Sequence, residues 1–472
     1  MSQQVRVRFA PSPTGPLHIG GIRTALYNYL FAKKNNGTFV LRIEDTDQTR
    51  YVANAEKYII DALNWCNIPF DEGPRQSERK HLYKNYANEL IEKGWAYYAF
   101  DTSESLDSLR KEHESEGKTF IYNWHNRAKV QNRINTETSG GENYVIRFKT
   151  PENETLQMQD EIRGNISIET NTLDDKVLFK SDGMPTYHLA NIVDDHLMEI
   201  SHVIRGEEWL PSLPLHYLLY KAFEWETPKF AHLPLLLKPV GKEYINEKTG
   251  DVSRGYKEDG YFADAFINML AFLGWNPGTE QEIFSLEELI ESFELKRVSK
   301  SGAKFNPDKA KWYNQQYMQQ KHNAELAELF LPILESKLSV IASDKEYVTK
   351  VVSLIKERAT FVSDFWDLSS FFFTAPTSFD AKAAKKQWKE TTPELMKELI
   401  EEINKIKDFS SENSEKEIKS WISGKEIGFG KVMQPLRLSL VGALKGPHLF
   451  DIMAMIGKQE TIKRIEFAID TL

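Results

Sequence analysis

Apolar and polar residues alternate along the first part of the chain with two different periods. Residues 4–10 alternate valine or phenylalanine with arginine, and this period of two predicts a strand. The glycine- and proline-rich residues 11–21 lead into residues 22–30, whose apolar side chains recur every four positions and predict a helix. A second strand over residues 38–43 and a second amphipathic helix through residues 59–65 follow. Strands that alternate with helices predict an α/β fold with a parallel sheet of Rossmann type.

The pattern changes beyond the first hundred residues. Segments from residue 101 onward are polar and mixed, so we expect residues 101–190 to be an insertion into the sheet domain. The first half of that domain then covers residues 1–100, and its second half, with a junction, covers residues 191–320.

The last third of the chain has a different composition again. No glycine occurs between Gly302 and Gly424, and apolar residues recur three and four positions apart. This composition favours helices. We therefore expect residues 321–472 to form a predominantly α-helical domain.

Overall composition places the chain among folded proteins. Hydrophobic residues make up 41% and charged residues 27% of the 472 positions, close to globular averages. The net charge of -9 would repel a polyanion as a whole. Residues 1–50, however, hold seven Lys or Arg against three Asp or Glu, so local binding of nucleic acid stays open.

A single cysteine, Cys66, rules out an internal disulfide framework and a zinc site that needs several thiolates. No zinc is therefore expected, and the free thiol suits a reducing compartment. Residues 1–10 lack an apolar signal region, and no run approaches the ~18 apolar residues of a membrane helix. We expect a cytoplasmic protein without a membrane partner.

The loop after the first predicted strand carries a histidine and two glycines at the start of a helix. His18, Gly20 and Gly21 suit a phosphate, because backbone N–H groups at a helix start attract an anion and glycine lets it approach. Alone, the pattern is equally an ordinary strand-to-helix turn. It matches neither the dinucleotide fingerprint nor the Walker loop, which weakens the case for hydride-transfer enzymes and Walker-type ATPases.

The wider sequence gives this loop a context. Residues 11–21 (PSPTGPLHIGG), followed by RTALYNYLFA and RIEDTD, resemble the class I aminoacyl-tRNA synthetases, and within them the glutamyl-tRNA synthetases. The runs over residues 179–198, 201–214 and 266–277 resemble the same family in the same order. The resemblance covers most of residues 5–315.

This resemblance implies a fold and an activity. It implies a class I Rossmann-type parallel sheet, an inserted domain that receives the tRNA acceptor end, and a helical domain of the bacterial type that binds the anticodon. The implied reaction is ATP-dependent activation of L-glutamate to glutamyl-adenylate, followed by transfer to the terminal ribose of tRNA(Glu). The implied substrates are glutamate, ATP with Mg²⁺, and tRNA, and the family expectation is a monomer.

The resemblance also assigns roles to particular residues. The catalytic, ATP-binding motif of the HIGH type comprises Ser12, His18, Gly20 and Gly21, and Lys242 flanks a further ATP-binding loop. Glutamate has two carboxylates and an ammonium group, so its pocket needs separated cations and an anion. The implied pocket has Arg8 with Tyr187 and Asn191 at the side-chain carboxylate, Arg205 at the α-carboxylate, and Glu44 with Ser12 at the ammonium group.

Each of these assignments has a structural alternative. Arg8 could be a solvated residue on an outer strand face. Tyr187 and Asn191 could be helix neighbours bonded to each other.

For several other residues we prefer the structural interpretation. Asp45 and Asp47 are expected to cap a helix N-terminus, and the aromatic side chains are expected in the core rather than against bases. His188 and His202 are likewise expected to be structural. The core set comprises Trp209, Phe371, Phe372 and Phe373.

One element of the family pattern is missing. A lysine-rich loop of the KMSKS type belongs soon after residues 235–241, but Lys242 runs directly into Glu243. The run Val298 to Ser301 resembles such a loop superficially, but its context is that of the later junction. We therefore predict that the true polypeptide is longer, with extra lysine-bearing residues next to Lys242.

Other functions stay open on the sequence. A catalytically inert tRNA-binding homologue would explain the missing loop, and a related synthetase, a tRNA-modifying paralogue or a nucleotidylyltransferase without RNA are further alternatives. The sequence does not decide whether tRNA(Gln) is also charged. Arg358 and Arg437 are candidates for reading the anticodon.

Overall fold

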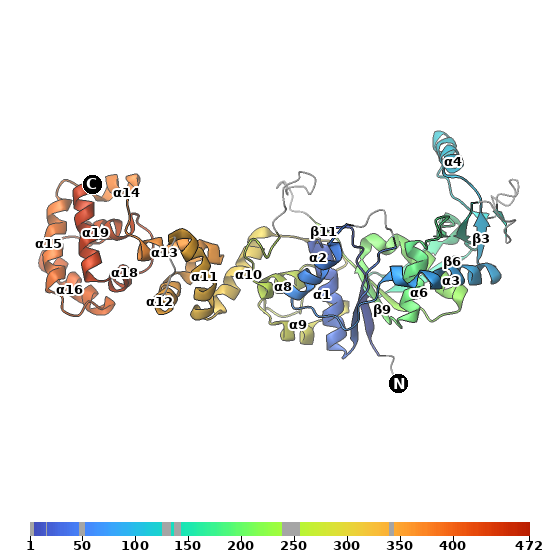
Figure 1. Ribbon diagram of the computed structural model, residues 1–472, viewed down its shortest axis with the longest axis horizontal. Helices are drawn as coiled ribbons and strands as arrows, with labels where there is room; N and C mark the ends of the chain where they lie inside the picture. The colour runs from blue at the N-terminus through green and yellow to red at the C-terminus, as the bar shows by residue number, and fades with distance from the viewer. Residues whose placement is uncertain are drawn as a thin grey trace. The chain divides into compact units, whose positions relative to one another are not determined.

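The computed structural model describes residues 4–15, 17–46, 52–124, 134–135, 143–237, 255–338 and 344–472. The chain divides into two compact units, whose residues can be followed by number along the colour bar of Figure 1. Unit 1 comprises Met1–Asp251 and Phe266–Pro307, and unit 2 comprises Val252–Ala265 and Asp308–Leu472.

Unit 1 contains a six-stranded sheet in the order β2-β1-β9-β10-β6-β7, of which Figure 1 labels β9 and β6. The first five of these strands run parallel, which confirms the predicted Rossmann-type sheet. Strand β7 pairs antiparallel with β6 because a short connection joins the two. The bounds are β1 Arg6–Phe9, β2 Thr38–Leu41, β6 Thr155–Asp160, β7 Gly164–Glu169, β9 His202–Gly206 and β10 Lys229–Leu233.

The first strand and helix follow the predicted pattern, with one difference. Strand β1 has three buried residues out of four, Arg8 among them, so Arg8 is not a solvated residue on an outer face. Helix α1 (Ile19–Lys34) buries Leu26 and Leu30, as its spacing predicts. It ends before Gly37, where a Cβ atom would lie 2.3 Å from the carbonyl oxygen of Val5, so only glycine allows this approach to β1.

A second, antiparallel sheet has the order β4-β3-β5-β8. The expected insertion, residues 101–190, contributes strands to both sheets, since β6 and β7 join the larger one. Strand β3 of the smaller sheet precedes residue 101. The bounds are β3 Ala96–Ala99, β4 Ile134–Asn135, β5 Val145–Phe148 and β8 Val177–Phe179, and a separate two-stranded pair joins β11 Leu236–Leu237 to β12 Ala303–Lys304.

The remaining described elements of unit 1 are helical. Helices α6, α7 and α3 pack around the core that includes Leu189, Val193 and Leu219. Their bounds, with the other helices and the 3₁₀ turns, are α2 Ala55–Trp65, η2 Gln76–Arg79, α3 Lys80–Glu92, α4 Ser103–Ser115, η3 Thr170–Thr172, α6 Tyr187–Leu197, η4 Glu207–Ser212, α7 Leu213–Phe223, α9 Leu286–Ser292 and η5 Leu295–Arg297.

Asp45, which the sequence predicts to cap a helix N-terminus, bonds the first turn of η2 and not α2. That helix begins after Asn54, whose side chain makes no capping bond. Asp45 instead accepts hydrogen bonds from the backbone N and the Oγ of Ser77, at 2.8 and 2.6 Å, in the first turn of η2. Asp45 therefore bonds a backbone N–H at the start of a helical turn, and this turn is η2 because residues 72–75 fold back beside β2. Asp47 lies outside the described residues.

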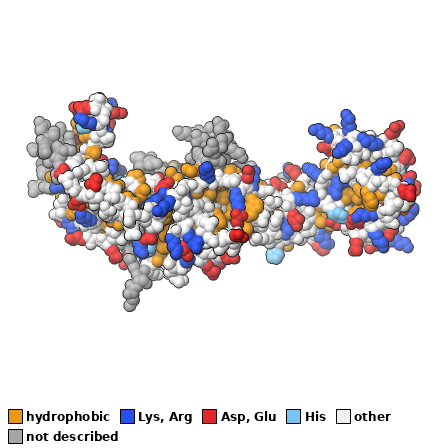
Figure 2. Space-filling model, turned by 180° about the vertical axis from the view of Figure 1, so that it is seen from behind, with side chains coloured by type: hydrophobic (Ala, Val, Ile, Leu, Met, Phe, Trp, Pro, Cys, Tyr) orange, Lys and Arg blue, Asp and Glu red, His pale blue; other side chains and the backbone are white. Residues whose placement is uncertain are grey.

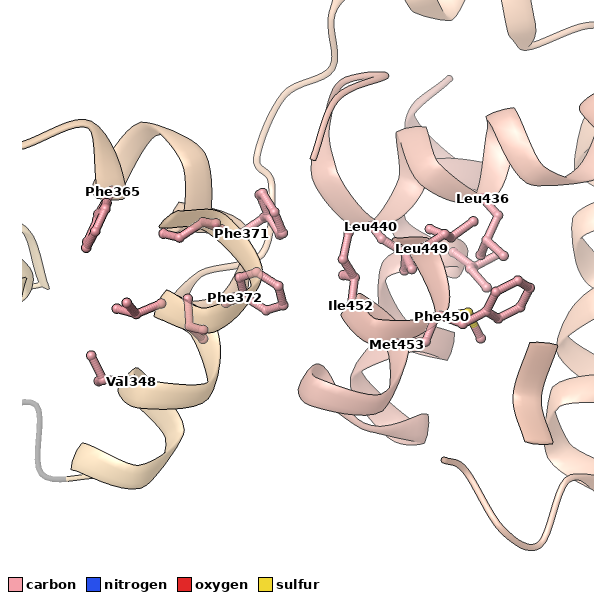
Figure 3. Close-up of a cluster of buried hydrophobic side chains, with 14 of the residues drawn as sticks. Val348, Phe365, Phe371, Phe372, Leu436, Leu440, Leu449, Phe450, Ile452 and Met453 are labelled. Atoms are coloured by element: carbon pink, nitrogen blue, oxygen red, sulfur yellow. The ribbon is translucent and has the colours of Figure 1, made fainter. Parts of the chain in front are cut away.

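Unit 2 is helical wherever regular structure is described, as the glycine-free composition predicts. Its core is apolar, and Figure 3 shows the helix faces that carry Phe365, Phe371, Phe372 and Phe450. Helix α8 (Ala263–Ala271) crosses from unit 2 into unit 1. The other bounds are α10 Pro307–Gln320, α11 Asn323–Leu338, α12 Lys345–Ile355, η6 Lys356–Arg358, η7 Val362–Asp364, α13 Phe365–Phe373, α14 Ala381–Gln387, α15 Thr392–Lys405, α16 Ser411–Gly424, α17 Gly430–Val441, α18 Leu449–Ile456 and α19 Lys458–Thr471.

The described surface mixes both signs of charge. Figure 2 shows Lys and Arg side chains next to Asp and Glu over the face that it presents. Many are neighbours on one helix, such as Lys397 with Glu394 and Lys405 with Glu402. Among the described residues, no helix is both long and apolar enough to cross a membrane.

Candidate active site

The carboxyl ends of the parallel strands meet at one edge of the main sheet. The chain runs from β1 outward to β2 on one side and from β9 outward to β10 on the other, so the strand order switches between β1 and β9. In open α/β sheets, ligands bind at the carboxyl ends of the strands beside such a switch point. Arg8 on β1 and Arg205 on β9 lie on the two strands that flank it.

Two arginines and two carboxylates form a buried cluster beside this point. Arg8 donates from Nε and Nη2 to the two carboxylate oxygens of Asp195, at 3.0 and 3.1 Å. Arg42, which is 0% exposed, donates to Asp195 at 2.6 Å and to Glu44 at 3.0 Å. The four formal charges cancel, which compensates for their burial. We name these four residues, Arg8, Arg42, Glu44 and Asp195, the Arg8 cluster.

Helix α6 presents one face to this cluster. Tyr187, Asn191 and Asp195 are spaced four residues apart and therefore share that face. With its amide oriented so that Oδ1 faces Arg42, Asn191 accepts a hydrogen bond from Arg42 at 2.8 Å and donates one to Asp195 at 3.2 Å. Tyr187 bonds Arg205 instead of Asn191. The interpretation of Tyr187 and Asn191 as mutually bonded surface neighbours is therefore wrong.

The two carboxylates of the cluster differ in their pKa. Burial by itself raises the pKa of Asp195, but the charges of Arg8 and Arg42 outweigh it and leave that pKa below its ordinary value. Burial raises the pKa of Glu44, and the opposing charges of Arg42 and Arg8 do not fully compensate. Glu44 is thus the carboxylate whose charged form an additional cation would stabilise.

Arg205 is buried among acceptors that carry no formal charge. Its Nη1 donates to the hydroxyl of Tyr187 at 2.9 Å, and its Nη2 donates to the carbonyl oxygen of Trp209 at 3.3 Å. Its Nε donates to Nε2 of His232 at 3.0 Å, and Nη1 also lies 3.4 Å from Nδ1 of His216. The guanidinium is thereby fixed in orientation without being neutralised.

The predicted aromatic core residues divide into two groups. Trp209 is 40% exposed, and its ring centroid lies 4.4 Å from that of Tyr187. The prediction that Trp209 is a core residue is wrong, because η4 carries it at the end of β9 and buries none of its residues. Phe371 and Phe372 are buried in the core of unit 2, as predicted, and Phe373 packs against that core.

The glycine-bearing loop forms the start of α1. His18 is exposed and caps this helix, its Nδ1 accepting from the backbone N of Gly21 at 3.2 Å. A Cβ atom on Gly20 would lie 3.9 Å from Leu236 of β11, so the segment just before residue 238 runs beside this loop. The first turn of α1 contains no acidic residue, which leaves its N-terminal dipole available to an anion.

The residue before Ser12 contacts Glu44 through the backbone. The backbone N of Glu44 donates to the carbonyl oxygen of Pro11 at 3.0 Å. Ser12 follows directly and is exposed. The end of β1 and the end of β2 are therefore held together, and they carry the hydroxyl and the carboxylate that the sequence assigns to one group of the substrate.

Sequence reasoning missed several residues that complete the site. Asp195 continues the spacing of Tyr187 and Asn191 by four residues, so the helical period could have identified it. Arg42 lies two positions before Glu44, directly after the end of β2, and bonds it. The histidines at positions 216 and 232 have no sequence signal of their own, because their roles depend on β9 lying next to β10 and α7.

The two histidines expected to be structural have separate surroundings. His202 contacts Ser201 at 2.9 Å, and its ring packs 4.8 Å from that of Phe31. His188 bonds His216 at 3.2 Å, and His216 in turn contacts Arg205.

Of the two lysine-bearing segments, residues 298–301 lie within the described ranges. Lys242 lies outside the described residues. In the run Val298 to Ser301, the Nζ of Lys300 lies 3.5 Å from the carbonyl oxygen of Arg163, after β6. Within the described ranges, no group of three or more His, Cys, Asp or Glu side chains is arranged to hold a metal ion.

Two family models match the chain. The model of the catalytic domain of class I tRNA synthetases (E and Q) matches residues 4–312, and the model of an anticodon binding domain matches residues 325–469. The first spans unit 1 and the described site, and the second lies within unit 2.

Full-length relatives agree with these models. The chain is 61% identical to the glutamate–tRNA ligase of Christiangramia forsetii and 63% identical to that of Flavobacterium psychrophilum, with complete coverage of both partners in each comparison. The first alignment spans 506 positions against 472 residues in this chain, a difference of 34.

A solved structure shares the architecture. The crystal structure of a glutamate tRNA ligase from Elizabethkingia meningosepticum, described as a complex with its amino acid, has a TM-score of 0.94. It is 50% identical to this chain, and the comparison covers all of both chains. The site at the switch point, the two family models and the full-length relatives lead to one conclusion: this chain belongs to the glutamate- and glutamine-type class I tRNA synthetases.

Proposed function

We propose that this protein is a glutamate–tRNA ligase, which activates L-glutamate with ATP and transfers it to the terminal ribose of tRNA(Glu). One observation carries the proposal. Two guanidinium groups lie at the ends of adjacent strands, and α6 holds each of them, Arg8 through Asp195 and Arg205 through Tyr187. Two separated, oriented cations suit a ligand with two carboxylates.

The charges of the site support an anionic ligand. The Arg8 cluster is formally neutral, and Arg205 adds one uncompensated positive charge. Glutamate as a zwitterion carries one net negative charge, so its binding would leave the site neutral. Glutamine would leave one buried positive charge, which is unfavourable in a medium of low dielectric constant.

Within this proposal the pocket residues keep their expected roles. Arg8, with Tyr187 and Asn191, binds the side-chain carboxylate, and Arg205 binds the α-carboxylate. Glu44, with Ser12, binds the ammonium group, which would also stabilise the charged form of Glu44.

The reaction needs no nucleophile from the protein. The α-carboxylate of glutamate attacks the α-phosphorus of ATP, pyrophosphate leaves, and the ribose hydroxyl of the tRNA then displaces AMP from the adenylate. The residues contribute by positioning and by electrostatic stabilisation of the phosphates. His18, Gly20 and Gly21 would bind ATP at the start of α1, and Mg²⁺ would enter with ATP as part of that substrate.

The tRNA is proposed to contact both units. Residues 101–190 would receive the acceptor end, and the helical domain would bind the anticodon. Arg358 and Arg437 are the candidates for the second contact, and both donate to carbonyl oxygens of residues 445–447, which brings their charges together. Burial lowers the pKa of Arg437, and the nearby charge of Arg358 lowers it further, so a polyanion would relieve this repulsion.

Compartment and assembly belong to the same proposal. Cys66 is a free, buried thiol, and burial raises its pKa to about 12, so it is unreactive and fits a reducing cytoplasm. A monomer is proposed from the family, and light scattering with size-exclusion chromatography measures it.

The alternative of an inert tRNA-binding homologue rests on the missing lysine loop. The 34 alignment positions of the C. forsetii enzyme without a counterpart in this chain support the prediction that residues are missing. The buried charged pocket favours an active enzyme, because an inert protein would gain little from retaining buried charges.

ATP–pyrophosphate exchange, measured with and without tRNA, tests the proposal. We expect glutamate-dependent exchange, and the resemblance implies that tRNA will be required. Filter binding with tRNA separates the alternatives. Binding without exchange would favour the inert homologue, and exchange without tRNA binding would favour a nucleotidylyltransferase.

A further inference from the structure

Arg205 differs from the other buried arginines of the site in its partners. Arg8 and Arg42 pair with carboxylates, whereas the four acceptors around Arg205 are a hydroxyl, a carbonyl oxygen and two imidazoles. In the part of the chain that the structure describes, Arg205 forms no ion pair with a carboxylate. Four neutral acceptors can orient a guanidinium without compensating its positive charge, which therefore stays available to an anionic ligand.

The chemistry of arginine fixes the state of both imidazoles. A guanidinium has five N–H donors and no acceptor, so each ring nitrogen that faces it must carry a lone pair. For His232 this nitrogen is Nε2, at 3.0 Å from Nε of Arg205. For His216 it is Nδ1, at 3.4 Å from Nη1.

Contacts on the far side of each ring complete the tautomers. Nδ1 of His232 lies 2.6 Å from Oδ2 of Asp160, so it carries the proton and donates it. Asp160 is itself fixed, since it accepts from the backbone N of Ile162 at 2.9 Å and of Arg163 at 2.7 Å. His216, the other imidazole that accepts from Arg205, has its proton on the opposite ring nitrogen.

His216 carries its proton on Nε2. This nitrogen lies 3.2 Å from Nδ1 of His188, to which it donates. His216 and His232 are both 0% exposed. Burial lowers the pKa of both rings, and the charge of Arg205 lowers it further in His216, which is consistent with two neutral imidazoles.

We propose that His232 and His216 are positioning residues which, as neutral imidazoles of opposite tautomer, hold Arg205 in the orientation that receives the α-carboxylate of glutamate. The proposal rests on the proposed function, which assigns that carboxylate to Arg205. Their neutrality is essential, because an acidic residue at either position would compete with the substrate for the guanidinium charge.

Amide side chains can test each tautomer separately. The terminal amide of glutamine reaches the position of a histidine Nε2, and that of asparagine reaches the position of Nδ1. At position 232, His232→Gln therefore keeps an acceptor for Arg205, and His232→Asn keeps only the donor to Asp160. At position 216 the order is reversed, since His216→Asn keeps the acceptor and His216→Gln keeps only the donor to His188.

The measurement is the Kd of the full-length chain for L-glutamate by isothermal titration, with the Kd for ATP as a second readout. We expect His232→Asn and His216→Gln to weaken glutamate binding about tenfold or more, and His232→Gln and His216→Asn to stay within about threefold of wild type. The Kd for ATP should be unchanged in all four variants. The matched control is His202→Gln, on the same strand as Arg205 but in contact with Phe31 and Ser201.

The outcomes separate the two proposals. Opposite orders of the Asn and Gln variants at the two positions support the tautomer assignment. The positioning role is wrong, and the proposed function stands, if wild type binds glutamate but the same amide variant is the weaker binder at both positions. The same holds if none of the variants changes the Kd for glutamate. If wild type binds no glutamate either with or without tRNA, both proposals fail. Circular dichroism checks that each variant folds. If a variant at one position does not fold, the two variants at the other position decide, and the proposal is overturned if the variant that keeps the acceptor for Arg205 binds glutamate more weakly there.

Discussion

Asp195 receives Arg8 through two parallel hydrogen bonds, Nε to Oδ1 at 3.0 Å and Nη2 to Oδ2 at 3.1 Å, with both side chains buried. The same carboxylate accepts from Arg42 at 2.6 Å. Asp195 therefore fixes the plane of the Arg8 guanidinium before any ligand arrives. Such preorganisation reduces the entropy that binding would otherwise lose.

Arg8→Gln should weaken glutamate binding far more than ATP binding. The change also leaves the buried Asp195 with one arginine, so we expect a loss of about 2–5 kcal/mol of unfolding free energy. Steady-state kinetics and urea denaturation measure the two effects. The double variant Arg8→Gln, Asp195→Asn should recover stability but not glutamate use. An unchanged KM and kcat for glutamate in Arg8→Gln would remove Arg8 from the pocket.

Asp195→Asn should flatten the acid limb of the stability profile. The pKa of Asp195 is lowered in the folded state, so its contribution is complete above the unfolded value of about 3.9 and is lost as the pH falls through the folded value. Urea denaturation between pH 7 and pH 3 tests this. Asp107→Asn, at an exposed position of α4, is the control and should retain the wild-type slope. Equal slopes in wild type and Asp195→Asn would contradict the lowered pKa.

Removal of residues 308–472 should abolish most tRNA affinity but retain glutamate binding. The Arg8 cluster and the acceptors of Arg205 all lie in unit 1, and Pro307 is its last residue. A chain that ends after Gln320 would instead retain α10, whose Met318 packs in the core of unit 2. Because this truncation removes the rest of that core, it would expose Met318, and we expect the protein to aggregate. Filter binding and isothermal titration measure the two affinities. Wild-type tRNA affinity in the shorter chain would place the main contact in unit 1.

Arg358→Gln and Arg437→Gln should each weaken tRNA binding and reduce its dependence on salt. Each arginine that neutralises a phosphate contributes about one unit to the slope of log K against log salt. Binding titrations at several salt concentrations measure this slope. Lys350→Gln is the control, because Lys350 is exposed and paired with Glu346 on α12. A slope that is unchanged in both arginine variants would exclude these residues from the phosphate contacts.

The intact polypeptide should be heavier than 54.6 kDa, the mass of the 472 residues. The chain has every residue that we propose for the glutamate pocket, so we expect the lysine loop to be present next to Lys242 in the natural protein. Intact-protein mass spectrometry of the untagged protein decides it. A mass of 54.6 kDa would mean that the loop is truly missing, and the inert homologue would then be preferred unless pyrophosphate exchange were still observed.

Local pattern was sufficient to predict several elements of both units. The alternation of residues 4–10 predicted β1, the spacing from Ile22 to Leu30 predicted α1, and the glycine-free region after Gly302 predicted the helices of unit 2. These predictions succeed because helix and strand periods depend on neighbours within a few residues. The set of Arg8, Glu44 and Arg205 came from the family resemblance.

Partners across the chain were decided only by the tertiary structure. Arg8 was open to a solvated interpretation because an alternating pattern does not say what covers the second face of a strand. Asp195 is 187 positions from Arg8, and Asp160 is 72 positions from His232. The first contact exists because α6 packs beside β1, and the second exists because β6, which ends at Asp160, pairs with β10, which carries His232. The sequence by itself determined which residue types are present, and the topology determined which of them meet, since burial and pairing depend on contacts between distant segments.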